Sequence, residues 1–393
     1  MSEPMSSSPL SGNASFSSEW CVLLECASPG HDPQRLTSLL GSVDWDRLLA
    51  LAQEHGLTGH LTACMREVAE ALVPQEIRQA LIDRQRAQIL SSLRLTVEMF
   101  RLLERFASEG IGALVVKGAV LAVRAYGDPA MRRYGDLDLL VRQRDIRRAT
   151  ELMSAAGYLA AVPLAAIDAG KIPGQYLFSK PDSKLIVELH NDLTLRYFPR
   201  RLPIEEFFAR QIRVRVDAHD APALSVEDEL VLICIHGAKH FWERLMWVAD
   251  VAALVSRQAG IDWQRVADSA RVVGAERILH IGLLLASDLL KARLPDKVRA
   301  AVQADAVATR LAEQTRKWLS APGYSPPALF ERALFRMRMR GGLIAAPAYL
   351  LRLSFSPTEE DWRDGPKANR HWLFSAIRRP IRLFRKYGRG GKT

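Results

Sequence analysis

The sequence of 393 residues predicts an α+β protein in which a small mixed β-sheet lies between helical regions. Two observations predict this fold class. Apolar residues recur every three or four positions before residue 109 and again after residue 225, which is the period of an amphipathic helix. Between these regions, short β-branched runs alternate with helix-like stretches. No apolar run approaches the roughly 20 residues that cross a bilayer, and no signal peptide is evident, so we expect a cytoplasmic protein.

The N-terminal part divides into a tail and a helical region. Residues 1–19 are rich in Ser, Gly and Pro, which predicts disorder. Residues 20–109 carry the helical period, and Gly110 supplies a helix stop.

In residues 110–220 the helical period gives way to short β-branched runs that alternate with helix-like stretches. These residues are expected to form the α/β core. The expected elements, in order, are a strand in IGALVVKG, a helix in AVLAVRAYG, a strand in DLDLLV, a helix in RDIRRATELMSAAGY, and two strands joined by a Pro-Asp turn in GQYLFSKPDSKLIVELHNDL. Strands interleaved with helices in this way predict a small sheet with at least one hairpin.

Residues 221–330 return to the helical period and are expected to form a helical domain. Ser225 is a suitable N-cap, with Asp228 three positions later in a start that resembles a capping box. The basic extension of residues 331–393 carries 15 Lys/Arg against 5 Asp/Glu, which accounts for the whole net charge of +10. Such an extension fits nucleic acid, an anionic lipid surface or an acidic partner as well as it fits a plain solvated face.

The cysteines show no metal-site or CxxC spacing, which predicts reduced and mostly buried thiols. They are Cys21, Cys26, Cys64 and Cys234.

Two aspartates open the second expected strand. Asp136 and Asp138 are separated by one residue, so in a strand their side chains share a face with Cα atoms about 7 Å apart. A hard divalent cation such as Mg²⁺ would remove the conflict between these like charges, because it prefers carboxylate oxygens, waters and phosphates. The alternative is that the two aspartates occur by chance at the start of a strand, where they are solvated or neutralised by Arg132 and Arg133.

Two further features favour the metal-site interpretation. Lys117 and Gly118 lie where a strand is expected to pass into a helix, and helix N-termini favour anions. Glu188 lies in an apolar strand with His190 on the same face, and a buried carboxylate needs a partner. The alternatives are a lysine and a glycine that only turn the chain, and a glutamate that faces solvent from an edge strand.

The ordered set of Lys117-Gly118, Asp136-x-Asp138 and Glu188 resembles the DNA polymerase β-like nucleotidyltransferase superfamily. Within it, the chain resembles an uncharacterised bacterial family that has Lys-Gly where most members have Gly-Ser. The resemblance also covers AQEHGL, VELH and HGAKHFWERLMWVADVAAL. It departs from the superfamily in two places, because Lys117 replaces the usual serine and the third carboxylate is Glu rather than Asp.

The resemblance implies a nucleotidyltransferase core and a Mg²⁺-dependent or Mn²⁺-dependent enzyme. It would transfer an NMP from an NTP, with ATP as the expected donor, to an acceptor hydroxyl or phosphate. Asp136, Asp138 and Glu188 would be the catalytic metal triad. The residues expected to bind the nucleotide are Lys117, Gly118, Arg132, Arg133, His236, Lys239 and His240.

The helical-domain residues of this set have a plain alternative. His236, Lys239, His240 and Glu243 are spaced to share one helix face, which fits either a cleft wall or a polar face packed on the core. Three other functions compete with nucleotidyl transfer: phosphoryl transfer from the same site, glycosyl transfer by a metal-binding DxD motif, and a non-catalytic nucleotide-binding scaffold that docks through the basic extension.

Overall fold

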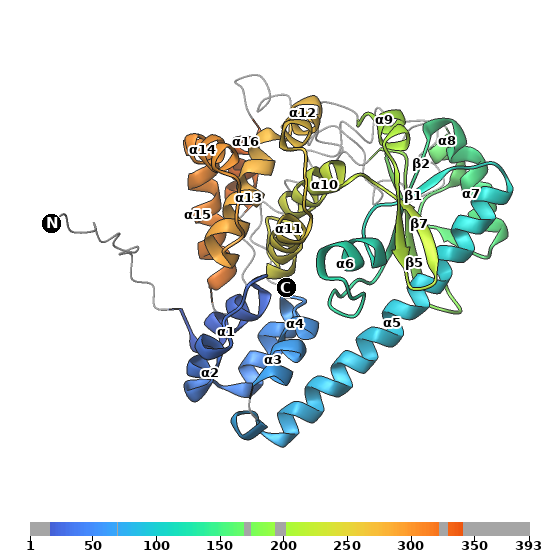
Figure 1. Ribbon diagram of the computed structural model, residues 1–393. Coiled ribbons are helices and arrows are strands. Elements are labelled where there is room, and N and C mark those ends of the chain that lie inside the picture. The colour runs from blue at the N-terminus through green and yellow to red at the C-terminus, as the bar shows by residue number, and fades with distance from the viewer. Residues whose placement is uncertain (1–15, 69, 169–173, 193–201, 322–328, 341–393) are drawn as a thin grey trace.

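The computed structural model describes residues 16–68, 70–168, 174–192, 202–321 and 329–340. The expected disordered tail lies almost wholly outside these ranges, and so does the basic extension after residue 340. The described chain is α+β as predicted, with a mixed sheet and helices before and after it (Figure 1). Within these ranges, every helix is too short or too polar to span a lipid bilayer.

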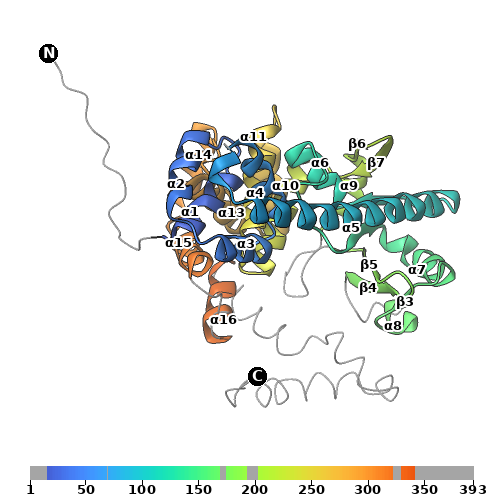
Figure 2. The same ribbon diagram turned by 90° about the horizontal axis from the view of Figure 1, so that it is seen from below.

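Short capped helices begin the fold, and one long helix connects them to the sheet. The short ones are α1 (Ser18–Ala27), α2 (Pro33–Leu39), α3 (Trp45–Glu54) and α4 (Thr58–Glu67). The long helix α5 (Gln75–Ser108) runs from this group to the sheet in both views (Figures 1 and 2). It ends just before Gly110, whose φ of 71° confirms the predicted helix stop.

The sheet has the strand order β3-β4-β5-β2-β1-β7-β6. The strands are β1 (Ala113–Val115), β2 (Leu137–Val141), β3 (Leu159–Ala160), β4 (Gln175–Lys180), β5 (Leu185–His190), β6 (Ile212–Val216) and β7 (His219–Ala223). The central pair β2 and β5 is parallel, whereas β4 and β5 form the predicted hairpin. The helices between strands are α6 (Ala119–Tyr126), α7 (Ile146–Ala155), α8 (Leu164–Asp168) and α9 (Ile204–Ala209).

The C-terminal helices begin at the predicted cap, where the Ser225 hydroxyl accepts a hydrogen bond from the Asp228 backbone N–H at 3.2 Å. They are α10 (Val226–Lys239), α11 (Leu245–Arg257), α12 (Trp263–Val273), α13 (Glu276–Leu290), α14 (Asp296–Ala304), α15 (Ala306–Ser320) and α16 (Leu329–Arg338). Their buried face shares one hydrophobic core with the N-terminal helices: Leu23 of α1, Val248 of α11 and Leu285 of α13 belong to the same cluster. A second core lies between the sheet and the C-terminal half of α5.

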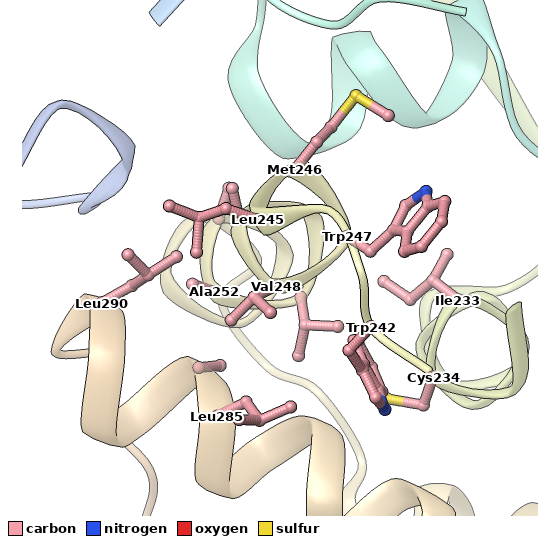
Figure 3. Close-up of a cluster of buried hydrophobic side chains, with 14 of the residues drawn as sticks. Ile233, Cys234, Trp242, Leu245, Met246, Trp247, Val248, Ala252, Leu285 and Leu290 are labelled. Carbon is pink, nitrogen blue, oxygen red and sulfur yellow. The ribbon is translucent and has the colours of Figure 1, made fainter. Parts of the chain in front are cut away.

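The end of α10 differs from the sequence expectation. The helix stops at Lys239, and Phe241 and Trp242 both take a φ of 55°, so Glu243 does not lie on the helix face predicted for it. Tertiary packing explains this stop, because Trp242 is fully buried where a Cβ at Gly237 would overlap its ring. Figure 3 shows Trp242 beside Cys234 in the core between α10, α11 and α13.

The thiols match the prediction from their spacing. All four cysteines are free; Cys26, Cys64 and Cys234 are buried, and Cys21 is half-buried.

Candidate active site

Two carboxylates meet where β2 runs parallel to β5. The register pairs Asp138 with Glu188, and the alternation of β5 puts His190 on the same face as Glu188. The Nε2 atom of His190 lies 3.0 Å from Oδ1 of Asp138 and 3.6 Å from Oε2 of Glu188. Groups that lie about 50 residues apart in the sequence therefore form one cluster.

Asp136 lies at the edge of this cluster and not in the strand. The strand begins at Leu137, so the prediction that both aspartates belong to it is wrong for Asp136, which is half-buried in the preceding bend. Burial and the nearby charge of Asp138 raise the pKa of Asp136. Both aspartates line the same cleft.

Lys117 provides the positive charge closest to Asp138. Its Nζ lies 3.1 Å from Oδ2 of Asp138 and 3.2 Å from Nδ1 of His236 on α10. Burial acts to raise the pKa of Asp138, but Lys117 and the hydrogen bond from His190 outweigh burial and lower it. Gly118 follows at the N-cap of α6 with a φ of 66°, a conformation that glycine adopts without strain.

The face of α10 supplies neutral imidazoles beside this lysine. Burial, together with the charge of Lys117, lowers the pKa of His236 well below its ordinary range, and burial lowers that of His240 to about 3. A neutral His236 can accept a hydrogen bond from the Lys117 ammonium, which has only donors. Both rings pack against Trp247 of α11, at centroid distances of 5.4 and 5.0 Å.

Lys239 reaches the carboxylates through Gln175, a residue that the sequence reading missed. Its Nζ donates to Oε1 of Gln175 at 3.2 Å, and the Gln175 side-chain amide N–H donates to Glu188. Burial lowers the pKa of Lys239, whereas burial and then the charge of Asp138 raise that of Glu188. The sequence does contain a signal for Gln175. If the two strands are paired outward from the Pro-Asp turn, Gln175 comes opposite His190, as it does in the hairpin.

These contacts form a closed polar circuit that starts and ends on α10. From Lys239 it passes through Gln175 of β4, then Glu188 and His190 of β5, and then Asp138 of β2. Asp138 contacts Lys117, and Lys117 contacts His236, one helical turn before Lys239. The sheet and the C-terminal helices are thus tied together by the side chains of the site.

The two arginines before Asp136 have different environments. The Nε of Arg132 donates to both carboxylate oxygens of Asp250 at 3.0 Å, and the Tyr126 hydroxyl donates to the same group. Arg132 is buried, and its Nε is already bonded to Asp250 of α11. A contact between Arg132 and phosphate stays a prediction. Arg133 is exposed and lines the cleft.

A cleft of about 1010 Å³ takes in part of this set. Its lining includes Lys117, Gly118, Arg132, Arg133, Asp136, Asp138, His236 and His240, but it does not include Glu188, His190, Gln175 or Lys239. One wall comes from α3, with Gln53 and Glu54, and another comes from the α10–α11 turn, with Glu243 and Arg244. The volume is at the upper end of ordinary ligand pockets, which run from about 300 to 1,000 Å³. The N-terminal helices therefore border the site as well as supporting the fold.

The donor atoms fit a divalent cation. Among the described residues, Asp138, Glu188 and His190 each offer a ligand atom within 4.8 Å of the others. Carboxylate oxygens suit Mg²⁺ and Mn²⁺. A cation would favour the charged form of Asp136 and Glu188, whose pKa is raised by burial and then by the charge of Asp138.

Comparison with known proteins agrees with the resemblance seen in the sequence. A family described as uncharacterised nucleotidyltransferase matches residues 41–291, which include the whole cleft and every residue of the polar circuit. A search of curated proteins finds no match.

Proposed function

Because the chain belongs to this family of uncharacterised nucleotidyltransferases, we propose that it moves an NMP from an NTP to an acceptor hydroxyl or phosphate, with ATP the first candidate donor. The acceptor oxygen forms a bond to the α-phosphorus, the bond from that phosphorus to the α,β-bridging oxygen breaks, and pyrophosphate leaves. The observation that carries the proposal is the meeting of Asp138 and Glu188 across two parallel strands beside the Lys117 ammonium.

Asp136, Asp138 and Glu188 would hold the divalent cation, Mg²⁺ or Mn²⁺. Such an ion polarises phosphoryl oxygens and neutralises their charge. Asp138 has the central position, because it lines the cleft and also belongs to the carboxylate and imidazole cluster.

Lys117 would bind the triphosphate while remaining anchored to the protein. An ammonium has three N–H donors, and Asp138 and His236 take two of them. The third is available for a phosphate oxygen. The backbone N–H groups at the start of α6, after Gly118, would add donors at a helix N-terminus.

Glu188 would take the proton from an acceptor hydroxyl. A carboxylate within reach of the hydroxyl can accept this proton or orient the hydroxyl for attack. The hydrogen bond from Gln175 holds this carboxylate in place. His236, His240 and Arg133 would complete the nucleotide-binding wall. Lys239 would support the site through Gln175, and Arg132 would support it through Asp250.

The test is label transfer by the full-length chain. ATP, GTP, CTP and UTP, each labelled at the α- or γ-phosphate, are incubated with Mg²⁺ and with hydroxyl-bearing metabolites, peptides and RNA. We expect α-label on an acceptor and no such product from Asp138→Ala. The matched control is Asp182→Ala, which alters an exposed aspartate in the turn of the β4–β5 hairpin and should transfer label normally.

Two results would replace the proposal. Transfer of γ-label alone would make the chain a phosphotransferase, a reading that Lys117 in place of the superfamily's usual serine keeps open. Nucleotide binding without transfer to any acceptor would favour the scaffold reading.

A further inference from the structure

The long helix α5 carries apolar side chains on two faces. Its inner face packs into the fold, where Met99 is 0% exposed and Leu102 is 2% exposed in the core between α5 and the sheet. On its outer face, Leu90 is 60% exposed, Leu93 50% and Val97 53%. Seen from below, α5 lies in front of the helices and the sheet (Figure 2). Exposed apolar residues that gather on one face, rather than occurring singly, mark an interaction surface.

The spacing on this outer face is that of a helix that pairs with another helix. Its positions are separated alternately by four and three residues, which is the a and d repeat of a coiled coil. They form the outer stripe: Arg86, Leu90, Leu93, Val97, Phe100 and Glu104. The four central members are apolar, and the two end members carry opposite charges. Phe100 is half-buried and its ring centroid lies 5.0 Å from that of His219, whereas the other five are exposed.

A cavity of about 920 Å³ borders the outer stripe beside the β6–β7 turn. Four members of the stripe line it, and Val216 of β6 lines its other side. Val216 belongs to the same core as Leu137 and Leu139, the neighbours of Asp138 in β2. Because side chains alternate along a strand, the cavity lies on the face of the sheet opposite to Asp138. The outer stripe is therefore separate from the candidate active site.

The charges of the outer stripe are complementary to the same stripe in reverse. The six positions are symmetrical about residue 95, so a second α5 that crosses antiparallel at that point places Arg86 opposite Glu104 at both ends. A parallel pair in register would instead place Arg86 opposite Arg86 and Glu104 opposite Glu104. Like charges in contact are destabilising, which favours the antiparallel arrangement.

The arginines beside the outer stripe distinguish between two possible occupants. Arg94, Arg101 and Arg105 are exposed on α5, so they would repel the chain's own extension of residues 331–393, which carries 15 Lys/Arg against 5 Asp/Glu. In the antiparallel arrangement each of them lies level with an uncharged residue of the second helix. In the same order, these residues are Thr96, Ile89 and Gln85.

We propose that a second copy of this chain covers the outer stripe, and that two α5 helices pair antiparallel about a two-fold axis near residue 95. Leu93 of one copy packs against Val97 of the other, and Leu90 packs against Phe100. The stripe covers 19 residues, which is about 27 Å of helix. Side chains of the second copy fill part of the adjoining cavity. This dimer does not depend on the proposed function, because the interface lies away from the active site.

Sedimentation velocity of the full-length chain measures its mass in solution, at concentrations from about 1 to 100 μM, where interfaces of modest size dissociate. We expect a dimer of twice the chain mass of 43.9 kDa. Leu93→Glu would bury a charge at the centre of the interface, so it should raise the dissociation constant by about 100-fold or more. The matched control is Leu159→Glu, which alters an apolar residue of β3 that is 60% exposed and should leave the dimer intact.

Charge variants test the antiparallel register. Arg86→Glu places two glutamates opposite each other at both ends, and Glu104→Arg places two arginines there, so each single variant should weaken the dimer roughly 10-fold. The double variant restores opposite charges and should dimerise within about 3-fold of the wild type. The Arg86 side chain is 72% exposed and Glu104 is also exposed, so the charge variants decide the matter if Leu93→Glu does not fold.

Three results would overturn the inference. A monomer at every concentration would mean that something other than a second copy, such as the basic extension, covers the outer stripe. A dimer that survives Leu93→Glu would place the interface elsewhere on the molecule. A double charge variant that dimerises no better than the single variants would reject the antiparallel register.

Discussion

Removing the ion pair between Lys117 and Asp138 should reveal a strong energetic coupling within the site. The perturbations are Lys117→Met, Asp138→Asn and the double variant. The two side chains are 13% and 3% exposed, and their charged atoms lie 3.1 Å apart. Each single change leaves the other charge in a largely buried position without this partner.

The magnitude follows from the distance and the burial. Two unit charges 3.1 Å apart attract by roughly 5 kcal/mol at an effective dielectric constant of about 20. Desolvation offsets part of this energy, and Asp138 keeps its hydrogen bond from His190. We therefore expect Lys117→Met to lower the free energy of unfolding by about 3 kcal/mol, and the double variant to be about 2 kcal/mol more stable than additivity predicts.

Urea denaturation at pH 7 in the presence of a chelator measures these free energies. The matched control is the exposed pair Arg148 and Glu109, whose charged atoms lie 2.6 Å apart with side chains 54% and 40% exposed. Its coupling should stay below about 1 kcal/mol, because solvent screens the interaction. Additivity within about 0.5 kcal/mol for Lys117 and Asp138 would refute the reasoning, since it would mean that the two charges do not meet in solution.

Three further predictions concern the fold and the site. Burial lowers the pKa of His60 from 6.5 to about 4, so the unfolded chain takes up a proton at a higher pH than the folded chain does. The free energy of unfolding should therefore drop by on the order of 3 kcal/mol as the pH falls from 6.5 to 4. His60→Leu should remove this part of the pH dependence, as measured by urea denaturation at several pH values. Gly237→Ala should lower the melting temperature strongly because its Cβ overlaps a buried indole, whereas Gly41→Ala, which meets no atom within 4 Å, should not; equal melting temperatures would contradict the packing. Gln175→Ala should slow NMP transfer by about 10- to 100-fold by releasing Glu188, with the melting temperature nearly unchanged; an unchanged rate would exclude a positioning role.

Local signals in the sequence predicted much of the fold. Ser225 as a cap, Gly110 as a stop and the hairpin around Pro181 and Asp182 all depend on residues within a few positions of one another. The alternation of β5 likewise placed Glu188 and His190 on one face. These features need no knowledge of distant contacts.

The remaining features depend on contacts between distant segments. The parallel pairing of β1 with β7 joins Val115 to Ala223, and a local pattern does not encode it. The end of α10 depends on Gly282 of α13, where a Cβ would lie 2.9 Å from the Trp242 ring. The hydrogen bond from Lys239 of α10 to Gln175 of β4 likewise joins segments 64 residues apart.

Measuring both products of one reaction tests most directly whether the enzyme transfers an NMP at the site formed by Asp138 and Glu188. With α-labelled NTP and an acceptor identified in the screen, labelled acceptor and pyrophosphate should accumulate in equal amounts. Asp138→Asn should lose both products, and Asp182→Ala should lose neither. Release of inorganic phosphate without pyrophosphate, or labelled acceptor that persists in Asp138→Asn, would contradict the claim.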